Sequence, residues 1–179
     1  PTPTPTITPS PTPTITPTPT PTITPTPTLT PFKRVFVTST RYDADLKTAA
    51  NSLPGPVVST GLDGGDKICK SRADAASLGG TWKAWLSIGA VNAVDRVYPS
   101  GTEATTYRRM DNALVANNKA DLIDGSIDNP INLDENKANP GSGYPYVWTG
   151  TYANGNGSGY YCSGWTYNRG AGASVGDLA

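Results

Sequence analysis

The stretch that decides the fold begins with Gly65-Asp66-Lys67-Ile68-Cys69 and ends with Leu78-Gly79-Gly80-Thr81-Trp82-Lys83-Ala84-Trp85-Leu86-Ser87. Between these two motifs, apolar side chains recur near helical spacing, at Ile68, Cys69, Ala73 and Ala76. This spacing predicts the main helix over residues 66–78, and the poor helix formers Gly79 and Gly80 predict its end. Apolar and polar side chains then alternate, which predicts a strand over residues 81–87.

Short strands and long loops are predicted on both sides of this stretch. The predicted strands are residues 33–39, 107–110, 113–117, 147–151 and 160–166, with the turn-forming pair Asp111-Asn112 between the second and third. One main helix, short and mostly antiparallel strands and long loops predict an α+β domain. In the strand after the helix, Trp82 or Trp85 should be buried, because two such rings are rarely both left in water.

The first 31 residues are almost entirely Pro and Thr. Residues 5–28 hold three copies of an eight-residue unit, Pro-Thr-Ile-Thr-Pro-(Ser/Thr)-Pro-Thr. Proline lacks an N–H and pushes the residue before it into extended conformations. We therefore expect residues 1–31 to be a disordered or polyproline-II spacer, and residues 32–179 to be one domain. Because a Gly-rich stretch leads to residues 177–179 without a closing strand, we expect the C-terminal end of that domain to be missing.

Charge and histidine content narrow the possible functions. Fourteen basic and fourteen acidic side chains give zero net charge, and no block of either sign occurs. This removes the electrostatic case for nucleic acid, heparin or an anionic membrane as the main partner, and no apolar run is long enough to span a bilayer. Because the chain has no histidine, catalysis by a serine–histidine or cysteine–histidine pair is excluded. We expect neither catalysis nor a cofactor.

Several of these residues resemble a known family. The motif Gly65-Asp66-x-x-Cys69 and residues 78–87 resemble the endostatin domain of collagen XVIII-type proteins, and Val147-Trp148-Thr149-Gly150 and Tyr161-Cys162-x-x-Trp165 resemble its later landmarks in the same order. The chain is more similar still to a related bacterial domain of unknown function, found in lipoproteins and surface proteins. That group has counterparts of residues 34–38 and 129–132. The resemblance spans roughly residues 33–176 and implies a C-type-lectin-like fold without known catalysis.

Two properties of endostatin do not carry over to this chain. Endostatin binds zinc partly through histidines near its start, and this sequence has none. Its heparin affinity comes from an arginine-rich face, whereas the basic residues here are scattered along the sequence.

Cys69 and Cys162 are the only cysteines. Beside a secretion-type spacer they indicate an oxidising compartment and disulfide use. A bridge between the two is the simpler hypothesis. The resemblance implies a different pairing, because endostatin's four cysteines pair in a nested order and these two would match the first and second. On that pattern their partners lie beyond Ala179 and the two do not bond each other. Neither is expected to be a nucleophile, since no histidine can act as its base.

Five acidic residues crowd one polar stretch: Asp121, Asp124, Asp128, Asp134 and Glu135. Calcium takes about six to eight oxygen ligands, which such a stretch could supply. The spacing matches neither an EF-hand nor the calcium motifs of sugar-binding C-type lectins. A carboxylate pair for glycoside hydrolysis would need two groups about 5 to 9.5 Å apart in a cleft. A solvated loop of turns and helix caps is therefore favoured over both.

Eight aromatic residues fall within residues 144–167, interleaved with Asn, Gly and Ser. Flat rings with a polar tip suit sugar or peptide surfaces. Trp148, Tyr161 and Trp165 are predicted to belong to the core. The candidate ligand-binding residues lie in the turns around them: Tyr144, Tyr146, Tyr152, Asn154 and Tyr160.

The main hypothesis is a non-enzymatic recognition or adhesion module, secreted or on the cell surface and held out by the Pro/Thr spacer. Its expected partner is an extracellular protein or glycan. The first alternative is a carbohydrate-binding module of a secreted polysaccharide-degrading enzyme, which an exposed coplanar row of rings would favour. The second is a hydrolase with two carboxylates, which needs a deep cleft.

Overall fold

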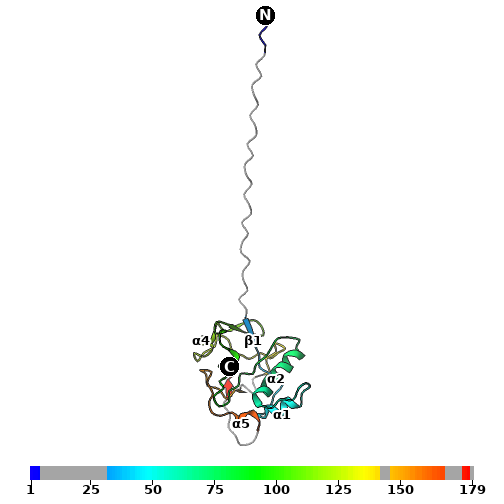
Figure 1. The fold of residues 1–179 in the computed structure, drawn as a ribbon, viewed down its shortest axis with the longest axis vertical. Coiled ribbons are helices and arrows are strands. Elements are labelled where there is room, and N and C mark those ends of the chain that lie inside the picture. The colour runs from blue at the N-terminus through cyan, green and yellow to red at the C-terminus, as the bar shows by residue number, and fades with distance from the viewer. Residues whose placement is uncertain (5–31, 142–145, 168–174, 178–179) are drawn as a thin grey trace. The chain divides into compact units, whose positions relative to one another are not determined.

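The computed structural model describes residues 1–4, 32–141, 146–167 and 175–177, and the chain divides into two compact units, Pro1–Thr30 and Pro31–Ala179 (Figure 1). In the first unit, residues 1–4 are exposed and form neither helix nor strand. The rest of the expected spacer, residues 5–31, lies outside the described residues.

The second unit is a mixed α+β domain of short elements and long loops, as the sequence predicts (Figure 1). Its described helices are α1 (Leu46–Asn51), α2 (Gly61–Ala75), α3 (Ala93–Val97), α4 (Lys119–Leu122) and α5 (Cys162–Trp165). Its described strands are β1 (Phe32–Val35), β2 (Thr106–Arg109), β3 (Leu114–Ala116), β4 (Tyr146–Trp148) and β5 (Val175–Asp177). No helix among the described residues is long and apolar enough to cross a membrane.

The larger sheet has the order β1-β2-β3. β2 and β3 form the predicted antiparallel hairpin, in which Asn112 takes a left-handed φ of 74° and donates its N–H to the Arg109 carbonyl. β1 runs parallel to β2, with Phe32 opposite Thr106. The hairpin is therefore confirmed, and β1 extends it into a mixed sheet.

The smaller sheet pairs β4 with β5 in antiparallel orientation. β4 ends at Trp148, so it is shorter than the strand predicted over residues 147–151. The chain leaves the strand direction at Gly150, whose φ of 59° lies in the left-handed region that glycine tolerates.

The main helix, α2, begins and ends earlier than the sequence predicts. Thr60 caps it, since its hydroxyl oxygen accepts the Asp63 N–H at 3.1 Å. The helix ends at Ala75 rather than residue 78, and Ser77 already has a left-handed φ of 56°. The sequence alone does not identify Thr60 as the cap, because the glycines that follow it, at positions 61, 64 and 65, are poor helix formers.

Those glycines are required by packing. A Cβ on Gly64 would lie 2.6 Å from the Leu46 carbonyl oxygen of α1, and a Cβ on Gly65 would lie 2.5 Å from the Leu86 side chain. Glycine lowers helix propensity by only about 1 kcal/mol, and close contact between α2 and its neighbours outweighs this. Tertiary packing thus overrides the local signal that placed the helix start at Asp66.

Residues 81–87 form no strand, contrary to the prediction. Ala84 and Leu86 are buried, as alternation implies. Side chains, however, take the backbone groups that a neighbouring strand would use. Asp66 accepts the Ala84 N–H at 2.8 Å, and Arg96 donates to the carbonyl oxygens of Ala84 and Leu86. The Leu86 N–H turns back to the Ala84 carbonyl at 2.9 Å, so the segment is irregular and is held largely by these side chains.

Trp82 and Trp85 are both partly buried, and neither is an exposed side chain. The Trp82 ring lies 4.8 Å from the Phe36 ring, and its Nε1 donates to the Gly79 carbonyl at 2.7 Å. Trp85 packs against buried residues of α3 and the larger sheet.

Residues 160–166 form a turn where the sequence predicts a strand. The backbone winds left-handed through α5, with positive φ from Cys162 (45°) to Trp165 (61°). Such angles are unfavourable for residues other than glycine. The turn brings Trp165 into the core, where it is 0% exposed and donates its Nε1–H to the Ser87 carbonyl at 3.0 Å. The prediction that Trp165 is a core residue is confirmed.

Two clusters of buried side chains pack the described part of the domain. The first core cluster joins α1, α2 and α5, and its members are Ala44, Leu46, Ala50, Ile68, Ala84, Leu86, Cys162 and Trp165. The second packs α3 on the larger sheet and consists of Val94, Val97, Tyr98, Tyr107 and Val115. Because Ala84 and Leu86 belong to the first and Trp85 packs against the second, residues 81–87 connect the two.

Candidate functional site: an aromatic-lined cleft

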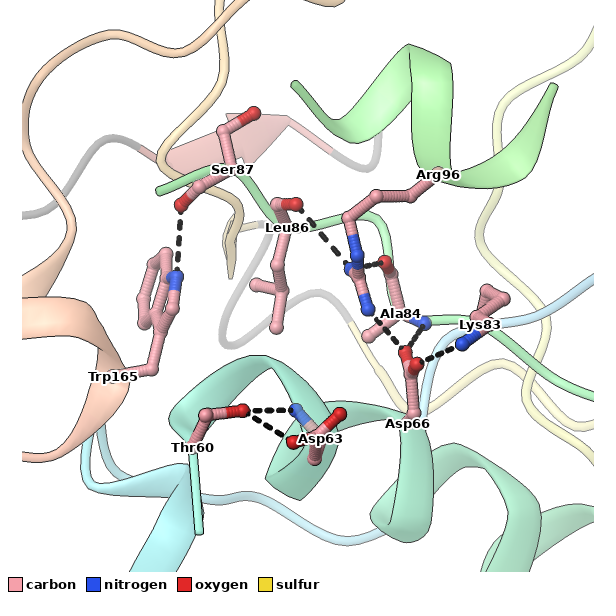
Figure 2. A network of polar contacts seen from close by, with 9 residues as sticks. All are labelled: Thr60, Asp63, Asp66, Lys83, Ala84, Leu86, Ser87, Arg96 and Trp165. Atoms are coloured by element: carbon pink, nitrogen blue, oxygen red, sulfur yellow. Dashed lines mark hydrogen bonds and ion pairs between the residues drawn. The ribbon is translucent and has the colours of Figure 1, made fainter. Parts of the chain in front are cut away.

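A polar network centred on Asp66 holds the site's scaffold together (Figure 2). Its Oδ1 accepts from Arg96 Nη2 at 2.6 Å and from the Ala84 N–H at 2.8 Å, and its Oδ2 accepts from Lys83 Nζ at 2.7 Å. Arg96 also donates to the carbonyl oxygens of Ala84 and Leu86. The side chains of Asp66 and Arg96 are only 14% and 11% exposed. Because these polar groups satisfy one another, the network supports the fold.

Ser87 extends this scaffold to the loop after β4. Its N–H donates to the Thr149 carbonyl at 3.0 Å, and its hydroxyl lies 2.8 Å from the Thr151 hydroxyl. The Ser87 hydroxyl oxygen also accepts the Ala93 N–H at 2.9 Å. The Ser87 backbone carbonyl accepts the Trp165 indole N–H (Figure 2). A single buried serine therefore ties α3, α5 and the end of β4 together.

A cleft of about 1580 Å³ opens beside the scaffold. Its walls come from β1, residues 78–86, 146–149 and 151–153, among others. Of the aromatic side chains in its described lining, three are exposed: Tyr146 by 62%, Trp148 by 41% and Tyr152 by 56%. Alternate residues of a strand share one face, so Tyr146 and Trp148 lie on the same side of β4. A concave surface with exposed rings is suited to ligand contact.

The candidate ligand-binding residues fall into three groups. Tyr146 and Tyr152 line the cleft. Tyr160 is 63% exposed but lies outside the cleft lining. Asn154 is exposed as well and also lies outside the lining; its Oδ1 accepts the Asn156 N–H within a turn. Tyr144 lies outside the described residues.

Trp148 is exposed, although the sequence predicts a core residue. The strand alternation explains the error, since the partly buried Val147 takes the opposite face of β4. Tyr161, also predicted to be in the core, is partly buried and packs against the first core cluster. The sequence alone does not show that Trp148 is exposed, because this depends on which face of β4 carries it.

Among the described residues, five basic side chains line the cleft, a feature that sequence reasoning missed. They come from distant parts of the chain: Lys33, Arg34, Arg41, Lys83 and Arg96. Among the described lining residues there is one acidic side chain, Asp134, and it is buried. No run of like charge marks these positions in the sequence, because only folding brings them together.

The two cysteines lie in different surroundings. Cys69 on α2 lines the cleft, Cys162 is buried in the first core cluster, and no disulfide joins them. The nested pairing that the resemblance implies stays a prediction. Burial, reinforced by the nearby Asp66 carboxylate, raises the pKa of the Cys69 thiol to about 12. At neutral pH this thiol is protonated and therefore a poor nucleophile.

The acidic stretch is in part the solvated loop that the sequence favours, since Asp124 and Asp128 are exposed and Asp124 accepts the Ser126 N–H within a turn. Its last two acidic residues depart from that prediction. Asp134 and Glu135 are only 5% and 3% exposed. Asp134 accepts the N–H groups of Asn136 and Ala138, and Glu135 accepts the Ser39 N–H at 2.9 Å together with the Ser39 hydroxyl. The Asp134 carboxylate thus stabilises its own turn, and the Glu135 carboxylate joins that turn to the segment after β1. In the part of the chain that the structure describes, no group of three or more cysteine or acidic side chains is placed to hold a metal ion.

Fold and site together define a small mixed α+β domain with an aromatic-lined cleft. Residues 56–178 match the family described as "Protein of unknown function (DUF1554)". This match covers more than half of the chain, and the chain belongs to that family. No curated protein matches the chain.

Proposed function

We propose that the domain is a non-catalytic recognition module, secreted or displayed on a cell surface, that binds an extracellular protein or glycan in the aromatic-lined cleft. The exposure of Tyr146, Trp148 and Tyr152 along one cleft carries this proposal. Aromatic side chains give a large contact area at low entropic cost, and gathered exposed apolar surface typically marks an interaction site. The Pro/Thr-rich stretch supports an extracellular location, because such stretches are typical of spacers and glycosylated stalks.

An endostatin-like, C-type-lectin-like architecture is part of this proposal. Its support is the order of the landmarks. The main helix is followed by Gly79-Gly80, by the partly buried segment 81–87 and, much later, by Trp165. Trp165 donates a hydrogen bond to the carbonyl of Ser87, the last residue of that segment, so two of these motifs are in direct contact.

The absence of catalysis is supported by the chemistry of the cleft. The chain has no histidine, and the Cys69 thiol has a raised pKa. Hydrolysis of a glycoside needs two carboxyl groups across a cleft. Asp134 is the one carboxylate in the described lining, and it is engaged by backbone N–H groups. These features also favour a binding role over the two-carboxylate hydrolase.

A carbohydrate-binding module is the second candidate function. The observation that favours it is the placement of Tyr146 and Trp148 on one side of β4, both exposed. Two neighbouring rings on one strand give consecutive stacking positions for a polymer.

Isothermal titration calorimetry of the full chain tests both candidates. The panel consists of oligosaccharides from cellulose, xylan, chitin, mannan and pectin, together with soluble collagen and fibronectin. We expect saturable binding to at least one probe, and a loss of about tenfold or more in Trp148→Ala and Tyr146→Ala. Tyr160→Ala is the matched control, because it removes an equally exposed ring outside the cleft. Binding that survives both cleft variants, or no binding by any probe, would contradict the proposal.

A further inference from the structure

We infer that the ligand of the cleft is an acidic polysaccharide whose negative charges are uronate carboxylates, an inference that rests on the proposed function. The charge of the cleft leads to it. Five basic side chains and one acidic side chain line the cleft among the described residues, although the chain as a whole has zero net charge. Positive charge is thus concentrated in the cleft, and complementary charge favours association and selects the partner.

Among the described residues, no carboxylate forms an ion pair with Lys33 or Arg34. Lys33 Nζ donates to the Val97 carbonyl at 2.9 Å, and Arg34 Nη2 donates to the Leu78 carbonyl at 3.0 Å. Both acceptors are neutral. The two side chains are also exposed. A guanidinium has five N–H donors in a planar fork, so Arg34 keeps donors that can bind a carboxylate in bidentate fashion.

The Asp66 network adds a further positive charge beside the cleft. Lys83 and Arg96 share the single carboxylate of Asp66, so the group of three stays positive. Arg96 is held inside at 11% exposure, whereas the Lys83 side chain is 51% exposed. Lys83 can therefore face a ligand while Arg96 holds the scaffold.

The aromatic side chains favour a sugar polymer over an acidic peptide. Tyr146 and Trp148 are alternate residues of β4, which places them about 6.4 to 6.8 Å apart along the strand. Pyranose rings have C–H faces that pack on aromatic rings, and a polysaccharide repeats such a face with every sugar. An acidic peptide would meet the same cations but has no repeating flat face for two adjacent exposed rings.

The density of charge favours carboxylates over sulfates. A highly sulfated chain carries more than one charge per sugar and needs a dense basic surface. Here the cations Lys33 and Arg34 are few and share the cleft with exposed rings. A uronate chain carries at most one carboxylate per sugar, which leaves ring faces free for Tyr146 and Trp148.

Calorimetry of the full chain with oligogalacturonate and with its methyl ester tests the inference, because the ester keeps the sugar and removes the charge. The acid should bind about tenfold more tightly than the ester, and only its binding should weaken when salt is raised. The double variant Lys33→Gln/Arg34→Gln should bind the acid as weakly as the ester. Lys33→Gln/Arg34→Lys should recover most of the lost affinity.

A matched control is Lys67→Gln/Lys137→Gln, which removes the same charge outside the cleft lining. Lys67 also donates to backbone carbonyls, those of Leu53 and Pro56, and this variant should change affinity less than twofold. Equal binding of acid and ester, with Trp148→Ala still abolishing both, would overturn the inference and leave the proposed function standing. Tighter binding of dextran sulfate or polyglutamate than of oligogalacturonate at equal charge, or no binding of oligogalacturonate at all, would also overturn it.

Discussion

The domain uses tryptophan in opposite ways in two of its regions. In the scaffold, Trp165 is 0% exposed, its N–H bonds to Ser87, and a Cβ on Gly150 would lie 2.8 Å from its ring. Along the cleft, Trp148 is 41% exposed beside the exposed Tyr146. Every contact of the first ring is with the chain, while much of the second is open to water. The difference teaches that the backbone position of a ring, rather than its chemistry, assigns it to folding or to recognition.

Replacing each tryptophan by alanine tests this contrast most strongly. Trp165→Ala should lower the free energy of unfolding by about 3–5 kcal/mol, since it removes a fully buried side chain and leaves a cavity. Trp148→Ala should lower it by about 1 kcal/mol or less, because the ring is already partly in water. Urea unfolding followed by circular dichroism measures both.

A loss of 3–5 kcal/mol can unfold a domain of ordinary stability altogether. Trp165→Phe therefore serves as the milder variant, since it keeps an aromatic ring and loses the hydrogen bond to Ser87. We expect a cost of about 1–2 kcal/mol. Equal stabilities for the Trp165 and Trp148 variants would remove the distinction between scaffold and cleft.

The scaffold also shows how much of the fold can be predicted from the sequence. The helix, the β2–β3 hairpin and the α+β class follow from local signals. The start of α2 does not, because Gly64 and Gly65 weaken a helix locally and are required by its contacts with Leu46 and Leu86. The strand predicted at residues 81–87 fails for a similar reason, since its backbone partners are the side chains of Asp66 and Arg96. Partners distant in sequence decide both cases.

Asp66→Asn tests whether the negative charge of Asp66, rather than its hydrogen-bonding shape alone, stabilises the fold. The substitution keeps an oxygen for the Ala84 N–H but leaves Arg96, which is 11% exposed, without its carboxylate. Leaving a buried charge unpaired is costly, and we expect a loss of about 2 kcal/mol in unfolding free energy. Asp74→Asn is the matched control, because the Lys70–Asp74 pair is exposed on both sides and should contribute about 0.5 kcal/mol or less. Similar losses for both variants would show that the network is no more than a surface pair.

Thr60→Ala sharpens the comparison at the start of α2. The Thr60 hydroxyl accepts the Asp63 N–H at 3.1 Å and donates to the Asp63 carboxylate at 2.6 Å. Loss of such a cap costs about 1 kcal/mol. Thr60→Ser keeps the hydroxyl and should restore nearly all of the stability in the same urea titration. An unchanged midpoint in Thr60→Ala would place the start of the helix elsewhere.

The cleft is less visible in the sequence than the scaffold. Tyr146 and Tyr152 can be found because aromatic residues are dense along that part of the chain. Lys33 and Lys83 cannot, since their meeting in one cleft depends on how β1 packs beside residues 78–86. The exposure of Trp148 depends on the register of β4, which periodicity over three residues does not determine.

Cys69 lies where the two regions meet, because it belongs to α2 and lines the cleft. Burial raises the pKa of its thiol from 9.0 to about 12. Between these values the unfolded chain loses the proton and the folded domain keeps it, so stability falls as pH rises. Cys69→Ala removes this loss, and its unfolding free energy relative to wild type should increase by about 1 kcal/mol between about pH 8 and pH 10. The buried tyrosines titrate equally in both proteins and cancel in that difference. Urea titrations of both proteins at both pH values measure this difference. An equal loss of unfolding free energy in wild type and Cys69→Ala would mean that the thiol is open to water.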